Sequence, residues 1–126
     1  MLMDKHFTSD EANQALPRVR ALVSQILEAR QKIVANYPQL EPVFNHAVGN
    51  GGSKTASDMI VEFQRIETNA KTLQELGVVL KDLSTGLVDF PSLRDGREVL
   101  LCWKYDEPQV AYWHDLESGF AGRQRL

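Results

Sequence analysis

The sequence predicts an α+β fold in which an N-terminal antiparallel helical hairpin packs on a small C-terminal antiparallel β-meander. Three observations predict it: two stretches with apolar residues every three or four positions, short β-prone runs after Gly77, and turn residues between those runs. The 126 residues, 43% of them hydrophobic and 25% charged, suit a single domain with one modest core. We place the hairpin at about 8–76, a flexible loop at about 38–55, and the meander and tail at about 78–126.

The first helix has a well-specified start. Thr8 and Glu11 form the pattern of a capping box, in which each side chain accepts from the other residue's amide. Pro17 removes one amide, so either a short helix ends near Leu16 or a longer helix kinks there. A single apolar stripe then continues to the Asn36-Tyr37-Pro38 stop: Val19, Leu22, Val23, Ile26, Ile33, Val34 and Tyr37.

The second helix follows the proline- and glycine-rich loop, and Ser57 or Thr55 could cap it. Gly77 stops it, because glycine adopts the left-handed conformation that other residues resist. One face carries its apolar stripe: Met59, Ile60, Phe63, Ile66, Ala70, Leu73 and Leu76. Two helices with one apolar stripe each pair most simply as an antiparallel hairpin.

Four short β-prone runs follow, and their close spacing favours antiparallel pairing. They are Val78–Leu80, Gly86–Phe90, Arg97–Lys104 and Gln109–His114. In the third run we expect Val99, Leu101 and Trp103 to face the core.

If the helices cover only that side, the other side of the sheet needs a lid, which a second copy of the chain could supply as a two-fold homodimer. The apolar residues that need this lid are Leu100, Cys102, Val110 and Tyr112.

Composition excludes several classes of protein. The net charge of −3 and the lack of a basic half disfavour a general nucleic-acid binder. A lone Cys102 cannot form an internal disulfide or, by itself, a thiolate metal cage. The first residues lack the apolar run of a secretory signal, and no stretch is apolar enough to span a membrane. We therefore expect a cytoplasmic protein.

His114 has three interpretations, which the sequence leaves open. It could end a strand and bond a backbone carbonyl, the ordinary structural role of a histidine. It could act in acid–base chemistry, oriented by Asp89 or Asp115. It could also ligate a divalent metal together with Glu117, although a metal site needs three or four converging ligands.

Aromatic and arginine residues gather in the same half of the chain. Trp103 and Trp113 suit core or interface anchors. Arg97 and Arg123 could hold a carboxylate or phosphate as an anion clamp, with the amides of 119–122 forming a nest. Alternatively, the charged residues around the turn, Arg94, Asp95, Arg97 and Glu98, could simply pair on the surface. Cys102 suits a small buried apolar residue.

The chain resembles the bacterial domain of unknown function 2203 family over nearly its whole length, apart from 39–55. The likeness rests on short motifs in order, among them Leu16-Pro17-Arg18-Val19, Gly86-Leu87-Val88-Asp89-Phe90-Pro91, Leu101-Cys102-Trp103, Tyr112-Trp113-His114 and Gly119-Phe120-Ala121-Gly122-Arg123. The resemblance implies a small bacterial cytoplasmic protein. It supplies no reaction, cofactor or catalytic residue.

Our leading hypothesis is a non-enzymatic homo-oligomeric module that binds a protein partner or a small anionic ligand through its C-terminal strands. No complete catalytic or metal constellation can be assembled from the sequence, so we assign no cofactor, no metal and no membrane or nucleic-acid partner. The binding residues that we expect are Asp89, Arg97, Trp103, Trp113, His114 and Arg123. The alternative is a small enzyme, or an anion- or metal-binding protein, that uses His114 as an acid–base or ligand residue and Arg97 with Arg123 as the clamp.

Overall fold

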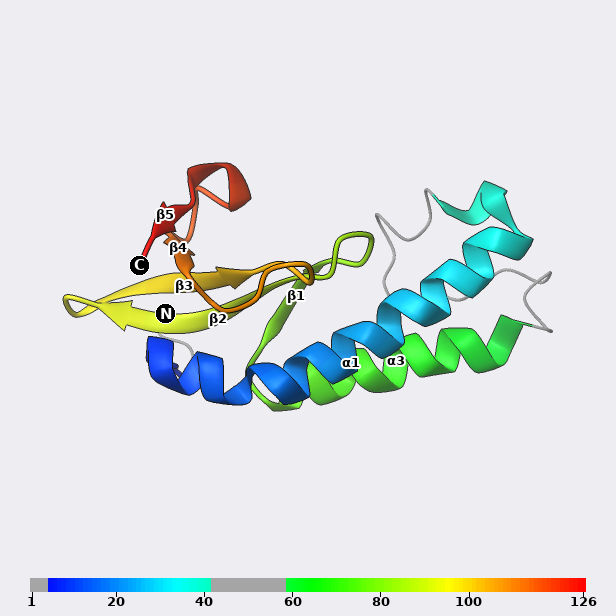
Figure 1. Ribbon diagram of the computed structural model, residues 1–126, viewed down its shortest axis with the longest axis horizontal. Coiled ribbons are helices and arrows are strands. Elements are labelled where there is room, and N and C mark those ends of the chain that lie inside the picture. Colours follow the sequence, from blue (N-terminus) through cyan, green and yellow to red (C-terminus); the bar gives the residue numbers. More distant parts are fainter. Residues whose placement is uncertain (1–4, 42–58) are drawn as a thin grey trace.

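The computed structural model describes residues 5–41 and 59–126, and its architecture is the expected α+β fold (Figure 1). Helices α1 (Ser9–Asn36) and α3 (Ile60–Glu75) lie side by side, with the sheet over one end of the pair. The sheet has the order β1-β2-β3-β4-β5, and every neighbouring pair is antiparallel. Its strands are β1 (Val79–Asp82), β2 (Leu87–Arg94), β3 (Arg97–Trp103), β4 (Tyr112–His114) and β5 (Gln124–Arg125).

Helix α1 begins at the expected capping box. The Glu11 amide donates to Thr8 Oγ1 at 3.1 Å, and the Thr8 amide donates to Glu11 Oε1 at 2.9 Å. The helix then continues for 28 residues through Pro17, so the alternative of a short helix ending near Leu16 is wrong. Pro17 is exposed. The hydrogen bond that it removes therefore lies on the solvent side of α1, where its loss costs less than in a core.

Helix α3 uses most of its predicted apolar stripe. Met59, Ile66 and Leu73 are buried, but Ile60 is 49% exposed, so its assignment to the stripe is wrong. With 3.6 residues per turn, Ile60 lies about 100° around the helix from Met59 and away from the packed face. The helix ends two residues before Gly77, whose φ is 87° and whose amide donates to the Gln74 carbonyl. The proposed caps Ser57 and Thr55 lie outside the described residues.

The connection after α1 begins with a short 3₁₀ helix, η1 (Pro38–Leu40), where we expected irregular chain. Residues 42–55 of the predicted loop lie outside the described residues. Another 3₁₀ helix, η3 (Phe120–Gly122), precedes β5. Strand β5 was not predicted, because two residues are too few to show an alternating pattern.

The register of β2 and β3 follows from the turn that joins them. Asp95 and Gly96 both have positive φ, 54° and 78°, which is the geometry of a tight two-residue hairpin. Arg94 therefore pairs with Arg97, and the ladder continues to Val88 opposite Trp103. Alternate residues of this ladder must point to opposite faces of the sheet.

The face toward the helices carries the core. Val99, Leu101 and Trp103 lie in one buried cluster with residues of α1 and α3, which confirms the predicted core face of β3. Val110 belongs to this same cluster, so its placement on the opposite face is wrong. The side chain of Asn13 in α1 holds Val110 there, since it bonds both the amide and the carbonyl of Val110, at 2.8 and 3.1 Å.

The face away from the helices is also closed. Leu100 and Cys102 are only 4% and 0% exposed within a single chain, so the expectation that they need a second copy as a lid is wrong. Tyr112, on the same face, is partly covered by the guanidinium of Arg123, 4.1 Å from its ring centroid. Within residues 5–41 and 59–126, no helix combines the length and apolar character needed to cross a membrane.

Candidate functional site

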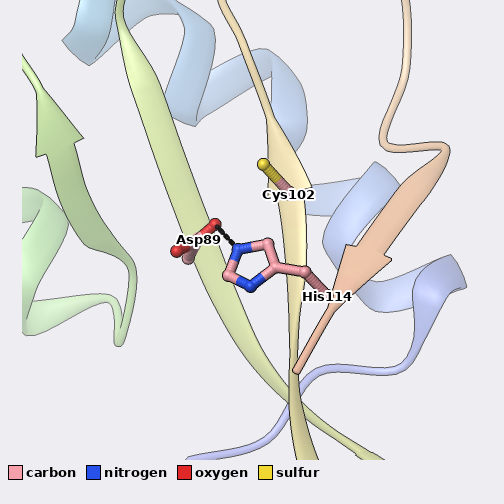
Figure 2. A group of neighbouring side chains, drawn as sticks. All are labelled: Asp89, Cys102 and His114. Atoms are coloured by element: carbon pink, nitrogen blue, oxygen red, sulfur yellow. Dashed lines mark hydrogen bonds and ion pairs between the residues drawn. The ribbon is translucent and has the colours of Figure 1, made fainter. Parts of the chain in front are cut away.

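Three polar or polarisable side chains meet on the face of the sheet away from the helices. Asp89 of β2 lies directly opposite Cys102 of β3, and His114 of β4 lies opposite Leu100, diagonal to Cys102. The carboxylate, thiol and imidazole donor atoms all lie within 4.8 Å of one another. Figure 2 shows this cluster, which we call the Asp89–Cys102–His114 cluster, between three adjacent strands.

The cluster is deeply buried. Asp89 and His114 are 2% and 3% exposed, and Cys102 is fully enclosed. Burying an ionisable group without a partner costs several kcal/mol, about the scale of a whole domain's stability. Asp89 and His114 therefore need each other as partners.

The hydrogen bonds of His114 fix the tautomer of its ring. Nδ1 lies 2.7 Å from the carbonyl oxygen of Asp115, and a carbonyl can only accept, so Nδ1 carries a proton. Nε2 lies 3.1 Å from Oδ1 of Asp89. That contact requires one further proton, held either by Nε2 facing a carboxylate or by a neutral Asp89 carboxyl facing an Nε2 lone pair. The Asp89–His114 pair thus shares a single proton.

The thiol of Cys102 is held in its neutral form. Burial raises its pKa to about 12, and the negative charge of Asp89 adds to this effect, while the guanidinium of Arg123 acts in the opposite direction. A thiol in this state is a poor nucleophile at neutral pH, because the thiolate is the reactive species.

Arg123 is bound by carboxylate and aromatic groups. It donates to both carboxylate oxygens of Glu107, each at 2.7 Å, and to the carbonyl of Cys102 at 3.2 Å. Its guanidinium also lies 4.1 Å from the ring of Tyr112 and 4.6 Å from that of Phe120. Burial by itself would raise the pKa of Glu107, but the hydrogen bonds from Arg123 and the Lys104 amide outweigh it and lower that pKa.

Arg97 lies at the hairpin end of β3 and has a different partner. Its Nη1 donates to Oδ1 of Asp115 at 2.6 Å, and the two side chains are 61% and 44% exposed. Both line an open groove of about 520 Å³, together with Glu98, Leu116, Glu117 and Ser118. Arg97 and Arg123 thus each bind a carboxylate of this chain. Glu117, the residue expected to share a metal ion with His114, lines this groove instead. The donor atoms that lie close to the His114 ring belong to Asp89 and Cys102.

The two tryptophans take the structural role. Trp103 is fully buried on the helix side, where its indole N–H donates to the Glu107 carbonyl at 2.9 Å and Arg20 lies 5.1 Å from its ring. Trp113 belongs to the same core cluster, with Arg94 4.6 Å from its ring. Of the six predicted binding residues, the structure brings Asp89 and His114 together and places both tryptophans on the opposite face.

Sequence reasoning missed two residues of this region. Cys102 was interpreted as a small apolar residue, although the two-residue turn at Asp95–Gly96 already places it opposite Asp89. Glu107, the partner of Arg123, lies in the turn after β3 and carries no local signal of that pairing. Asp89, rather than Asp115, is the carboxylate that bonds the His114 ring, since Asp115 offers its backbone carbonyl.

Comparison with known proteins assigns a family and no activity. No curated protein and no solved structure shows significant similarity to the chain. The family model described as "Uncharacterized conserved protein (DUF2203)" matches residues 5–126, the region that contains every element of the fold and the whole cluster. This confirms the family resemblance, and the chain belongs to the DUF2203 family.

Proposed function

We propose that this protein is a non-enzymatic ligand-binding module whose site lies on the C-terminal strands, at the Asp89–Cys102–His114 cluster. The observation that carries the proposal is the burial of an ionisable pair, Asp89 with His114, in the middle of the sheet and away from the helices. Replacing a buried ion pair by apolar side chains of similar volume is often neutral or stabilising, so stability alone does not explain this pair. Residues that break the ordinary rules of a stable core are expected at functional sites, because function rather than stability requires them there.

One feature disfavours the part of the alternative that uses Arg97 and Arg123 as an anion clamp. An anion clamp would need free guanidinium groups, but Arg123 binds both oxygens of Glu107 and Arg97 binds Asp115. A ligand would have to displace these carboxylates before it could bind either arginine.

The test is a ligand screen on the full chain with a matched pair of variants. Thermal unfolding is measured with a panel of carboxylates, phosphates, nucleotides and divalent metal ions. We expect at least one class to raise Tm, and we expect this rise to disappear in Asp89→Asn. His6→Gln is the control, since His6 also bonds a carboxylate, that of Glu98, at 2.8 Å. A panel without any stabilising compound, or equal effects on both variants, would overturn the proposal.

The homodimer, like the bacterial origin and the cytoplasmic location, remains a prediction. Its first argument is lost, because Leu100 and Cys102 are buried within one chain. Support comes instead from apolar side chains exposed around the C-terminal strands: Leu93, Leu116 and Phe120. Light scattering should detect the dimer mass at high protein concentration, and a strictly monomeric mass would remove this part of the proposal.

A further inference from the structure

We infer that Asp89, Cys102 and His114 form a binding site for one divalent transition-metal ion, with zinc the favoured ion. The inference rests on the proposed function, and it specifies the chemical class of the ligand. A carboxylate, a thiol and an imidazole converge from three adjacent strands with their donor atoms within 4.8 Å of one another. Among the described residues, these are the side chains that meet in a group of metal-ligand type.

The orientation of His114 suits a metal ligand. Its Nδ1–H donates to the Asp115 carbonyl at 2.7 Å, which directs Nε2 toward the other two side chains. Histidines that bind metals usually donate their second ring N–H to a carbonyl or carboxylate in this way, because the bond fixes both tautomer and ring direction. The backbone carbonyl directly after β4 therefore already holds the ring as a metal site requires.

The spacing of the donors is close to that of a tetrahedral zinc site. Zinc bond lengths of about 2.0–2.3 Å place the ligand atoms about 3.3–3.6 Å apart. Nε2 of His114 and Oδ1 of Asp89 are 3.1 Å apart, and the widest donor separation in the cluster is at most 4.8 Å. A side-chain movement of roughly 1 Å would bring all three atoms into the range for zinc.

The donor types select the class of ion. A mixed sulfur, nitrogen and oxygen set suits zinc and similar transition metals, whereas calcium and magnesium take oxygen ligands almost entirely. Three protein ligands leave a fourth position for water or a ligand atom. Binding would release two protons to solvent, that of the Cys102 thiol and the one shared by Asp89 and His114, because metals bind the deprotonated ligands.

The charge of the site is compatible with a divalent ion. A thiolate and a carboxylate together balance two positive charges. The nearby guanidinium of Arg123 does not add an uncompensated charge, since it forms a two-bond ion pair with Glu107. The ion would therefore replace two protons without leaving net charge buried in the sheet.

Metal titration of the full chain tests the inference. Chelator-treated protein receives Zn²⁺ or Co²⁺, followed by measurement of bound metal and of the Co²⁺ absorption spectrum. We expect one ion per chain, tetrahedral cobalt bands and a thiolate-to-cobalt charge-transfer band. Because Cys102 is the sole cysteine of the sequence, that band can arise only from it. Cys102→Ser should abolish the band and weaken zinc binding by more than about 100-fold, while His6→Gln should retain both.

The possible outcomes separate this inference from the proposed function. Wild-type protein that binds less than one zinc ion per chain, or binds cobalt without the charge-transfer band, overturns the metal site. If a different compound of the ligand screen still requires Asp89, the proposed function stands without the metal. Should Cys102→Ser fail to fold, the wild-type cobalt spectrum decides the question alone.

Discussion

Replacing Asp89 distinguishes the contribution of its charge to stability from the contribution of its hydrogen bond to His114. An asparagine there can donate its amide N–H to Nε2 of His114, whose Nδ1 already carries a proton. An alanine leaves Nε2 buried without a partner. We expect Asp89→Ala to lower the free energy of unfolding by about 1–3 kcal/mol and Asp89→Asn by clearly less. Urea unfolding at neutral pH measures both, and equal losses would show that the hydrogen bond is not what stabilises the pair.

Glu107 should make the free energy of unfolding depend on pH in the acidic range. Its pKa is lowered in the folded state, because the bonds from Arg123 and the Lys104 amide outweigh the effect of burial. The folded protein therefore holds the proton less tightly than the unfolded chain, and the stability from this group is lost as pH falls below the ordinary value of 4.5. We expect Glu107→Gln to be less stable than wild type at neutral pH, with a gap that narrows in acid.

Urea midpoints at about pH 7 and about pH 4 measure this gap. The exposed Glu67→Gln is the matched control and should show little difference from wild type at either pH. A gap that stays constant with pH would contradict the role of the Arg123–Glu107 pair.

Gly86 combines a left-handed backbone with close neighbours. Its φ is 68°, and an added Cβ would lie 2.8 Å from Val23 Cγ1 and 2.8 Å from Tyr105 Cβ. Gly96 has a similar φ of 78° but no atom within 4 Å of that position. We expect Gly96→Ala to cost about 1 kcal/mol from backbone strain alone, and Gly86→Ala to cost at least about 1 kcal/mol more. Thermal unfolding of both variants checks the order.

At the scale of elements, Asn13 connects helix α1 to the chain that leads into β4. Its side-chain amide bonds the Val110 amide and carbonyl, so it acts as a short strand partner supplied by a helix. We expect Asn13→Ala to lower the free energy of unfolding by about 1–3 kcal/mol, because two buried backbone groups lose their partners. Asn36→Ala is the control, since Asn36 is exposed and its side-chain amide bonds the local Lys32 carbonyl. Similar losses in both variants would contradict this link.

The same connection shows what the sequence could and could not predict. The capping box at Thr8, the stop at Gly77 and the core face of β3 are local patterns, and the structure confirms each of them. The placement of Val110 was wrong, because alternation along a strand was extended to a residue outside β4. Its position depends on Asn13, 97 residues away, and no local pattern records that contact.

The candidate site divides in the same way. A two-residue turn at Asp95–Gly96 fixes the pairing of Asp89 with Cys102, so this half of the cluster was available from the sequence. The register of His114 depends on the long connection between β3 and β4, whose geometry the sequence does not specify. Arg97 and Arg123 could be identified as candidates, but their carboxylate partners depend on tertiary contacts.

At the scale of the whole molecule, α1 connects the two layers. It packs along α3 and also contributes to the same buried cluster as β2 and β3. We therefore expect the helices and the sheet to unfold together. Far-UV circular dichroism follows mainly the helices, and fluorescence follows Trp103 and Trp113 in the sheet. The two transitions should coincide in urea, and helical signal that persists after the tryptophans are exposed would contradict a shared core.

The meander order has a consequence for how the cluster is assembled during synthesis. Each strand pairs with the strand that precedes it in the chain, so the sheet can grow in the direction of translation. Asp89 and Cys102 emerge on one hairpin and can meet early, whereas the imidazole arrives on β4, a strand of three residues. A nascent chain that has not yet reached residue 114 therefore carries a carboxylate facing a thiol without the imidazole, and the three donor atoms can converge only after β4 has been made.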